Sequence, residues 1–254
     1  MYPFVNRRNR MRINPLEEGL WLLDDAGEST CYVLAGSERA MVIDTVNGAE
    51  NLLEIVRELT DLPLMVVNTH GHCDHIYGNV YFDEAWMHPA DNDLAAAHFA
   101  MRESGAEPCP FRPLEVGQRI DLGGEEVEIV GLPGHTPGSI GVLDKKRRLL
   151  FSGDGLNPHI WMQLEESLSL TALQNTILAL KADHGTDFDR LLTGHAQDYT
   201  PAALLDDMLR GCEELLRGEG SADAPYHWFG GVCHQHRYDG NPDHVIVYRE
   251  EQFR

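Results

Sequence analysis

The chain has 254 residues, 43% of them hydrophobic, so it can bury a sizeable core as one large α/β domain or two small ones. Asp and Glu number 41 against 20 Lys and Arg, and the net charge of −21 disfavours a nucleic-acid partner, whose phosphates such a surface repels. The five cysteines are odd in number and widely spaced, which favours a reducing compartment over a disulfide framework.

The first half of the chain opens with a segment rich in arginine and poor in apolar runs. We expect Met1–Pro15 to be neither a secretory signal nor a membrane span, and the protein to be cytoplasmic with no membrane partner. Short runs of β-branched and aromatic residues, separated by glycine turns, then predict a β-meander: Gly19–Leu23, Thr30–Leu34 and Ala40–Ile43. Apolar spacing and turn residues predict the elements that follow: helix Ala49–Leu59, strand Leu64–Val67, helix Pro89–Arg102 and surface loop Glu103–Pro113.

The sequence of the second half of the chain predicts a second β-meander. Its strands are Gln118–Leu122, Glu126–Val130, Ser139–Leu143 and Arg148–Phe151. Later elements are helices Ser169–Ala182 and Pro201–Arg217, which flank strand Arg190–Leu192, and a closing strand Val245–Tyr248. Two sheet-rich halves with helices between and after them predict an α/β fold, a four-layered αββα sandwich. Because no linker interrupts the chain, we expect a single domain over residues 1–254.

Four potential metal ligands fall within six positions after the strand Leu64–Val67. In an extended loop, residues two apart point the same way, so His70 and His72 can close on one ion. Asp74 and His75, where the chain turns into a helix, can then address another ion. A lone histidine is usually a packing or surface residue, but core histidines rarely cluster with a carboxylate. The cluster therefore predicts a metal site.

Three further ligand-type residues stand in glycine-containing turns at strand ends. They are His135 within Gly134–Gly138, Asp154 within Ser152–Gly155, and His195 after Gly194. Asp154 alone would be interpreted as an ordinary turn aspartate. Beside the first cluster, a ligand role is the better interpretation.

As an ordered set, these residues resemble the five sequence motifs of the metallo-β-lactamase superfamily, over about Cys31–His195. The motif residues are Asp44, His70, His72, Asp74, His75, His135, Asp154 and His195. The resemblance implies two divalent metal ions, with zinc as the favoured metal and iron or manganese as alternatives. It implies that His70, His72 and His135 hold one ion, that Asp74, His75 and His195 hold the other, and that Asp154 bridges them. Asp74 and Asp154 would be the catalytic carboxylates, and Asp44 would steady the ligand loop.

The implied chemistry is hydrolysis. Two ions about 3.5–4 Å apart can share one water and lower its pKa towards neutrality, so the predicted reaction cleaves a small ester, thioester or lactone with a metal-bridging hydroxide. The bridging Asp154 argues against a true β-lactamase, and the similarity is closer to the glyoxalase II-like branch. The glutathione-binding residues of that branch have no clear counterpart in Ser221–Arg254, so glutathione thioester hydrolysis is not predicted. Cys73 is interpreted as a packing residue.

Other functions stay open at this point. A mononuclear iron dioxygenase acting on persulfides would share the fold and part of the ligand set, whereas the charge weakens a phosphodiesterase. A purely structural metal is disfavoured because structural zinc sites are saturated by four protein ligands. His159 and Trp161, which follow Asp154, either line a substrate cleft or are a solvent histidine and a buried tryptophan. The histidine-rich segment 226–236 resembles a mobile lid, and the sequence leaves the substrate and the oligomeric state open.

Overall fold

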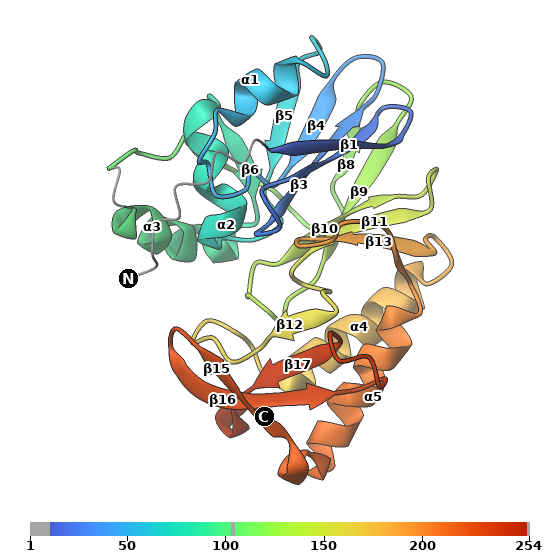
Figure 1. Cartoon of the computed structure of the whole chain (residues 1–254). Helices are drawn as coiled ribbons and strands as arrows, with labels where there is room; N and C mark the ends of the chain where they lie inside the picture. The colour runs from blue at the N-terminus through green and yellow to red at the C-terminus, as the bar shows by residue number, and fades with distance from the viewer. Residues whose placement is uncertain (1–10, 103–104, 253–254) are drawn as a thin grey trace.

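The computed structural model describes residues 11–102 and 105–252 (Figure 1). Within these ranges, a seven-stranded and a six-stranded sheet pack face to face, and helices cover their outer faces. This arrangement confirms the predicted αββα sandwich. The prediction for Met1–Pro15 falls largely on residues 1–10, outside the described ranges.

The first sheet has the strand order β1-β2-β3-β4-β5-β6-β7. The first four strands form an antiparallel meander, and β4 to β7 run parallel to one another. The loops that leave β4 and β5 therefore emerge at the same edge of the sheet. The strands are β1 (Arg12–Glu17), β2 (Leu20–Asp24), β3 (Thr30–Ala35), β4 (Ala40–Ile43), β5 (Leu64–Val67), β6 (Ala85–Met87) and β7 (Phe111–Pro113).

The second sheet has the order β14-β13-β11-β10-β9-β8. Its strands β11 and β13 are parallel, so the segments that follow them also emerge at one edge. The strands are β8 (Arg119–Asp121), β9 (Glu126–Gly131), β10 (Ile140–Asp144), β11 (Leu149–Gly153), β13 (Arg190–Thr193) and β14 (Thr200–Pro201).

The central core lies between these two sheets, and strand alternation sorts its residues. On β4, Met41 and Ile43 point into the space between the sheets, whereas Ala40 and Val42 point towards α1. On β11, Phe151 lies between the sheets and Leu150 packs towards α4 and α5. Both faces of both sheets are therefore covered with apolar side chains.

The helices follow the predicted pattern with shifted ends. They are α1 (Leu52–Arg57), α2 (Cys73–Ile76), α3 (Asn92–Met101), α4 (Leu170–His184) and α5 (Leu204–Leu216). Asn51 and Ser169 begin α1 and α4 as N-caps, because their side chains accept a backbone N–H three residues on. Pro201 was predicted to begin a helix but pairs in β14, so α5 starts later. No helix within the described ranges is both long and apolar enough to cross a bilayer.

A third sheet was not predicted. It has the order β12-β17-β16-β15 and consists of β12 (His159–Trp161), β15 (Ala224–Trp228), β16 (Gly231–Arg237) and β17 (Val245–Tyr248). Only β17 was expected. The segment interpreted as a mobile lid is a regular antiparallel hairpin, and Phe111–Pro113, expected in a loop, forms β7. Proline and glycine near both segments favour loops locally, but pairing with neighbouring strands overrides that preference.

Candidate metal centre

The predicted ligands lie at one edge of the sandwich, where loops leave both sheets. The segment His70–His75 follows β5, whereas Asp154 and His195 follow the parallel strands β11 and β13. His135 lies in the loop between β9 and β10. The ends of parallel strands meet at one sheet edge, so the fold gathers residues that are far apart in sequence into a single site.

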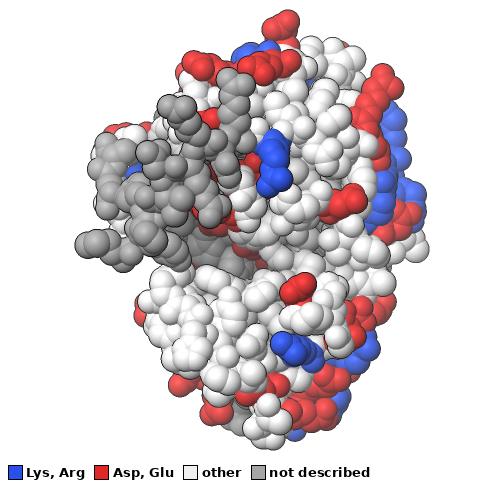
Figure 2. Space-filling model, in the orientation of Figure 1, with Lys and Arg blue, Asp and Glu red and all other residues white. Residues whose placement is uncertain are grey.

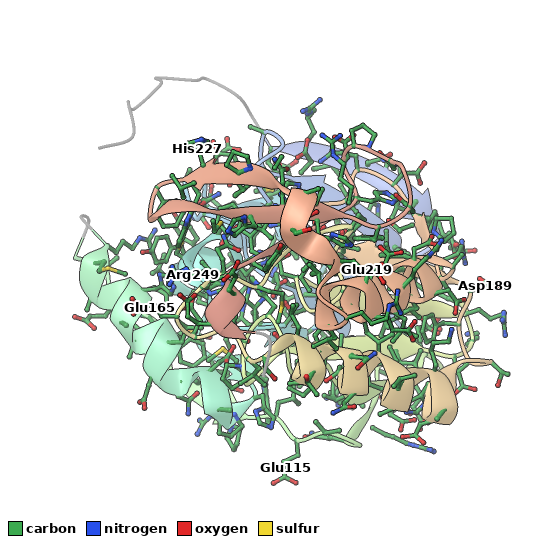
Figure 3. All side chains as sticks on the ribbon, turned by 90° about the horizontal axis from the view of Figure 1, so that it is seen from below. Glu115, Glu165, Asp189, Glu219, His227 and Arg249 are labelled. Carbon is green, nitrogen blue, oxygen red and sulfur yellow. The ribbon has the colours of Figure 1, made fainter. Side chains whose placement is uncertain are left out.

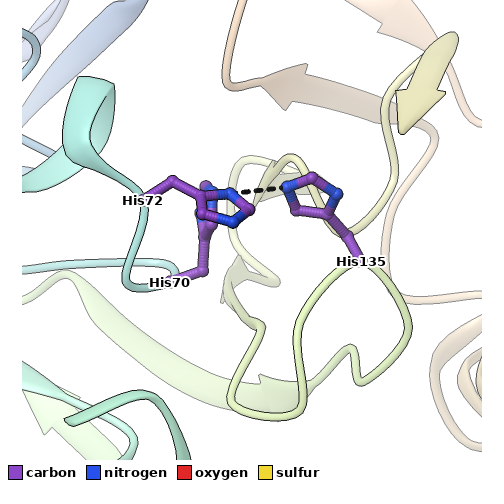
Figure 4. A group of neighbouring side chains, drawn as sticks. All are labelled: His70, His72 and His135. Atoms are coloured by element: carbon purple, nitrogen blue, oxygen red, sulfur yellow. Dashed lines mark hydrogen bonds between the residues drawn. The ribbon is translucent and has the colours of Figure 1, made fainter. Parts of the chain in front are cut away.

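His70, His72 and His135 form the first group of potential ligands (Figure 4). One ring nitrogen of each lies within 4.8 Å of those of the other two, and all three side chains are buried. His72 Nδ1 and His135 Nε2 face each other at 2.9 Å. Three imidazole nitrogens therefore converge on one small space.

The outer nitrogens of His72 and His135 are already engaged. His72 Nε2 lies 2.7 Å from Glu166 Oε1, and His135 Nδ1 lies 2.7 Å from the carbonyl oxygen of Trp161. A carboxylate and a carbonyl only accept, so each ring donates a proton on that side, which leaves the facing nitrogen free to present a lone pair. Two lone pairs at 2.9 Å repel each other unless a cation binds both, so the pair suits a metal ion.

Asp74, His75 and His195 form the second group, again with one ligand atom of each within 4.8 Å of the others. Asp74 Oδ2 lies 3.4 Å from His75 Nε2 and 3.7 Å from His195 Nε2. His195 Nδ1 donates to the carbonyl oxygen of Glu28 at 2.5 Å. His195 Nε2 consequently points into the group, where it lies 3.1 Å from Asp154 Oδ2.

Asp154 lies between the two groups. Its Oδ2 is 3.8 Å from His135 Nε2 in the first group, and 3.6 Å and 3.1 Å from His75 Nε2 and His195 Nε2 in the second. One carboxylate oxygen thus borders both groups, as a bridging ligand must. Gly194 keeps this space open, because a Cβ at that position would lie 2.2 Å from Asp154 Oδ1.

Asp44 supports both groups from behind. Its carboxylate accepts hydrogen bonds from Thr69 N at 2.7 Å and Thr69 Oγ1 at 2.8 Å, and its Oδ2 lies 3.0 Å from His75 Nδ1. Because the Thr69 hydroxyl donates to Asp44, it accepts from His70 Nδ1 at 3.0 Å. The Nε2 atoms of His70 and His75 are left pointing inward, buried and without a hydrogen-bond partner. Buried imidazole nitrogens without a hydrogen-bond partner fit a metal-binding role.

Burial and neighbouring charges shift the pKa values of the histidines in opposite directions in the two groups. Burial lowers the pKa of His70, and it lowers the pKa of His135 to about 4, so both rings are neutral and able to bind metal at neutral pH. Burial also opposes a charge on His75, but the carboxylates of Asp74 and Asp154 outweigh it and raise the pKa of His75. A metal ion in the second group must therefore displace a proton.

Asp91 is a positioning residue that was not predicted from the sequence. It is fully buried just before α3, yet its side chain does not cap that helix. Instead its Oδ2 accepts from Gly71 N at 2.9 Å and Thr136 Oγ1 at 2.6 Å, and its Oδ1 accepts from Gly138 N at 2.7 Å. Asp91 thus ties together the two loops that carry the first group. An aspartate before a helix looks like an ordinary cap, so the sequence gives no signal of this role.

Glu166 and His98 flank His72 and were not predicted either. Burial opposes ionisation of Glu166, but the hydrogen bond with His72, a backbone hydrogen bond and the charges of His72 and His135 together outweigh it and lower the pKa of Glu166 to about 2. His98, on α3, places its ring edge-to-face against His72 with centroids 5.5 Å apart. Neither residue stands in a motif, so only the folded arrangement reveals them.

The residues predicted to line a substrate cleft lie on β12, beside the centre. His159 and Trp161 are both half-buried, and both rings contact Tyr226 of the third sheet, with centroids 5.5 Å and 6.1 Å away. Cys73 belongs to neither ligand group. Burial raises the pKa of Cys73 to about 11, so it remains a thiol at neutral pH.

The sequence pattern of the Metallo-beta-lactamase superfamily matches residues 24–209, a span that contains both ligand groups and Asp154. The chain belongs to the metallo-β-lactamase superfamily. Among solved structures, a metallo-β-lactamase from Pontibacter korlensis superposes with a TM-score of 0.64 and 18% identity, covering 80% of this chain and 99% of that one. At that identity the likeness concerns the fold alone.

Two curated relatives within the superfamily are hydrolases by name. Acyl-coenzyme A thioesterase MBLAC2 from Gallus gallus is 32% identical over an alignment of 176 residues, which covers 55% of this chain and 64% of the thioesterase. Hydroxyacylglutathione hydrolase GloC from Haemophilus influenzae is 32% identical over an alignment of 145 residues, which covers 52% of this chain and 68% of that protein. The chain thus spans just under two thirds of the length of the thioesterase it matches.

Proposed function

We propose that this chain is a binuclear metal-dependent hydrolase that cleaves a small thioester, ester or lactone. The observation that carries the proposal is Asp154 Oδ2, which borders two groups of inward-pointing ligand atoms. In this proposal one ion binds His70, His72 and His135, the other binds Asp74, His75 and His195, and Asp154 bridges them. Single-domain organisation and a cytoplasmic location belong to the same proposal.

Two divalent ions bound there, zinc first with iron or manganese as alternatives, would supply Lewis acidity and an ionised water at neutral pH. The chain's own residues hold the ligands in register: Asp44 orients His75, and Glu166 orients His72. Asp74 and Asp154 are the catalytic carboxylates of this proposal, and Asp74 Oδ2 would bind the second ion beside His75 and His195. No side-chain nucleophile is required, which agrees with Cys73 remaining a thiol.

An acyl thioester is the favoured substrate class. The names of the two relatives, an acyl-coenzyme A thioesterase and a hydroxyacylglutathione hydrolase, support acyl transfer to water. The net charge of −21 disfavours a nucleic-acid substrate. A mononuclear iron dioxygenase needs only two histidines and one carboxylate, so a complete second group speaks against it.

The test is a substrate panel with the zinc-loaded protein. We expect turnover of chromogenic thioesters, esters or lactones, and little turnover of bis(p-nitrophenyl) phosphate. Hydrolysis of the phosphodiester alone would contradict the proposal. So would oxygen consumption with a persulfide by the iron-loaded protein in the absence of acyl hydrolysis.

A further inference from the structure

The third sheet has two faces with different surroundings. Ile160, Ile246 and Tyr248 pack on one face into the core with α4 and α5. The opposite face carries a second apolar cluster that does not belong to that core: Trp161, Tyr226, Trp228, Cys233, Val245 and Val247. Phe229, in the turn after β15, extends this cluster and is 72% exposed.

The aromatic rings of this face gather around Trp161. The ring of Trp161 lies 5.8 Å from that of Trp228, 6.0 Å from that of Phe229 and 6.1 Å from that of Tyr226, measured between centroids. Trp228 and Phe229 are 4.7 Å apart. We call these four residues the aromatic surface. Figure 2 shows few charged residues on the face where Figure 1 places the β15–β16 hairpin.

The aromatic surface begins at the metal centre. The backbone carbonyl of Trp161 accepts the hydrogen bond from His135 Nδ1 at 2.7 Å, so its side chain starts directly behind a residue of the first group. His159 shares this side of β12 and contacts Tyr226. The aromatic surface therefore extends from Trp161, next to the candidate centre, to Phe229 at the exposed tip of the hairpin, and a molecule held at the centre can lie along it.

We propose that the aromatic surface binds the apolar acyl chain of the substrate, so that the enzyme selects acyl groups of about six or more carbons over acetyl. This inference rests on the proposed function. Each methylene moved from water onto apolar surface favours binding, whereas an acetyl group is too short to reach beyond Trp161. A large exposed aromatic residue at the edge of such a cluster is best explained by a ligand that covers it.

The hairpin offers matched controls on its other face. His227 and Val232 form a cross-strand pair and alternate with Tyr226 and Trp228, so they point away from the aromatic surface. Val232 is 63% exposed and apolar, like Phe229. Figure 3 shows His227 at the outer edge of the hairpin. The guanidinium of Arg249 lies over the ring of Trp228, 5.7 Å from its centroid.

The first experiment measures binding: the tryptophan fluorescence of the protein is recorded during titration with decanoate and, separately, with acetate. We expect decanoate, but not acetate, to change the emission. Phe229→Ala should weaken decanoate binding about five- to tenfold, because the apolar contact with the phenyl ring is lost. Val232→Ala should stay within about twofold of wild type. Equal binding of decanoate by wild type and Phe229→Ala would overturn the inference.

The second measurement is kcat/KM for thioesters from acetyl to decanoyl. Wild type should favour the longer chains, and Phe229→Ala should flatten that dependence. If acetyl and decanoyl thioesters are cleaved equally by both proteins, the hydrolase proposal stands and the acyl-chain inference is wrong. If decanoate binds through Phe229 but no acyl compound is cleaved, the hydrolase proposal fails instead. A change of oligomeric mass in Phe229→Ala, with chain-length dependence unchanged, would identify a contact between copies and overturn the inference.

Discussion

Asp91→Asn tests how far the candidate centre depends on a residue outside both ligand groups. Asp91 is fully buried and accepts three hydrogen bonds, from Gly71 N, Thr136 Oγ1 and Gly138 N. Asparagine has almost the same shape but replaces one acceptor oxygen by a donor, which then faces a backbone N–H. A hydrogen bond to a charged group contributes about 1.5–3 kcal/mol, and an unsatisfied buried donor costs a similar amount. We expect the free energy of unfolding to fall by about 2–4 kcal/mol.

The same change should weaken metal binding. Gly71 and Gly138 lie in the two loops that carry the first group, so their relative position loosens when Asp91 no longer holds both. Supporting residues of this kind typically contribute 10- to 100-fold to metal affinity, and we expect a loss in about that range.

Urea denaturation of the metal-free protein and zinc titration against a chromogenic chelator measure the two effects separately. Asp93→Asn is the matched control, because Asp93 is exposed in the first turn of the same helix. It should change stability by less than about 0.5 kcal/mol. Wild-type stability and wild-type zinc affinity in Asp91→Asn would refute the reasoning.

Three further predictions concern the centre itself. Asp154→Ala should remain folded, lose most of its bound metal and lose about 10²-fold or more in kcat/KM, because one carboxylate oxygen borders both groups. Metal analysis and kinetics check this, and a wild-type metal content would contradict it. Zinc affinity should fall as pH drops, because carboxylates overcome burial and raise the pKa of His75, so the metal competes with a proton. A zinc affinity that does not change with pH would argue against the assignment of His75. In the metal-free protein, the raised pKa of His75 stabilises the fold below the ordinary histidine pKa, and this contribution is lost as pH rises through the raised value. Cys73→Ser should leave kcat/KM within about twofold across the pH profile, since the thiol pKa of about 11 excludes a thiolate nucleophile near neutrality; loss of an alkaline limb in this variant would show otherwise.

The sandwich could be predicted because its signals are local. The continuous apolar runs Ala40–Ile43 and Leu149–Phe151 indicate buried strands, and Ser169 marks the start of α4. The third sheet escaped prediction because Ala224–Trp228 contains Pro225 and ends beside two glycines. Its strand form depends on pairing with β16, which no local pattern encodes.

The residues of the candidate centre likewise fall into those that the local sequence reveals and those that only the fold reveals. Potential ligands at strand ends are visible in the sequence because histidine, aspartate and glycine recur there in a specific order. Asp91 and Glu166 are not visible, since their roles arise from contacts across the fold with Gly138 and His72. The orientation of each imidazole was likewise inaccessible, because it depends on partners such as the carbonyl oxygen of Trp161.

The most direct test of the central claim is the number of metal ions per chain, measured by inductively coupled plasma mass spectrometry after zinc loading and desalting. Two groups of ligands bordered by one carboxylate oxygen predict about two zinc ions per chain. One ion per chain, or stable binding of a single iron in preference to zinc, would contradict a binuclear hydrolase.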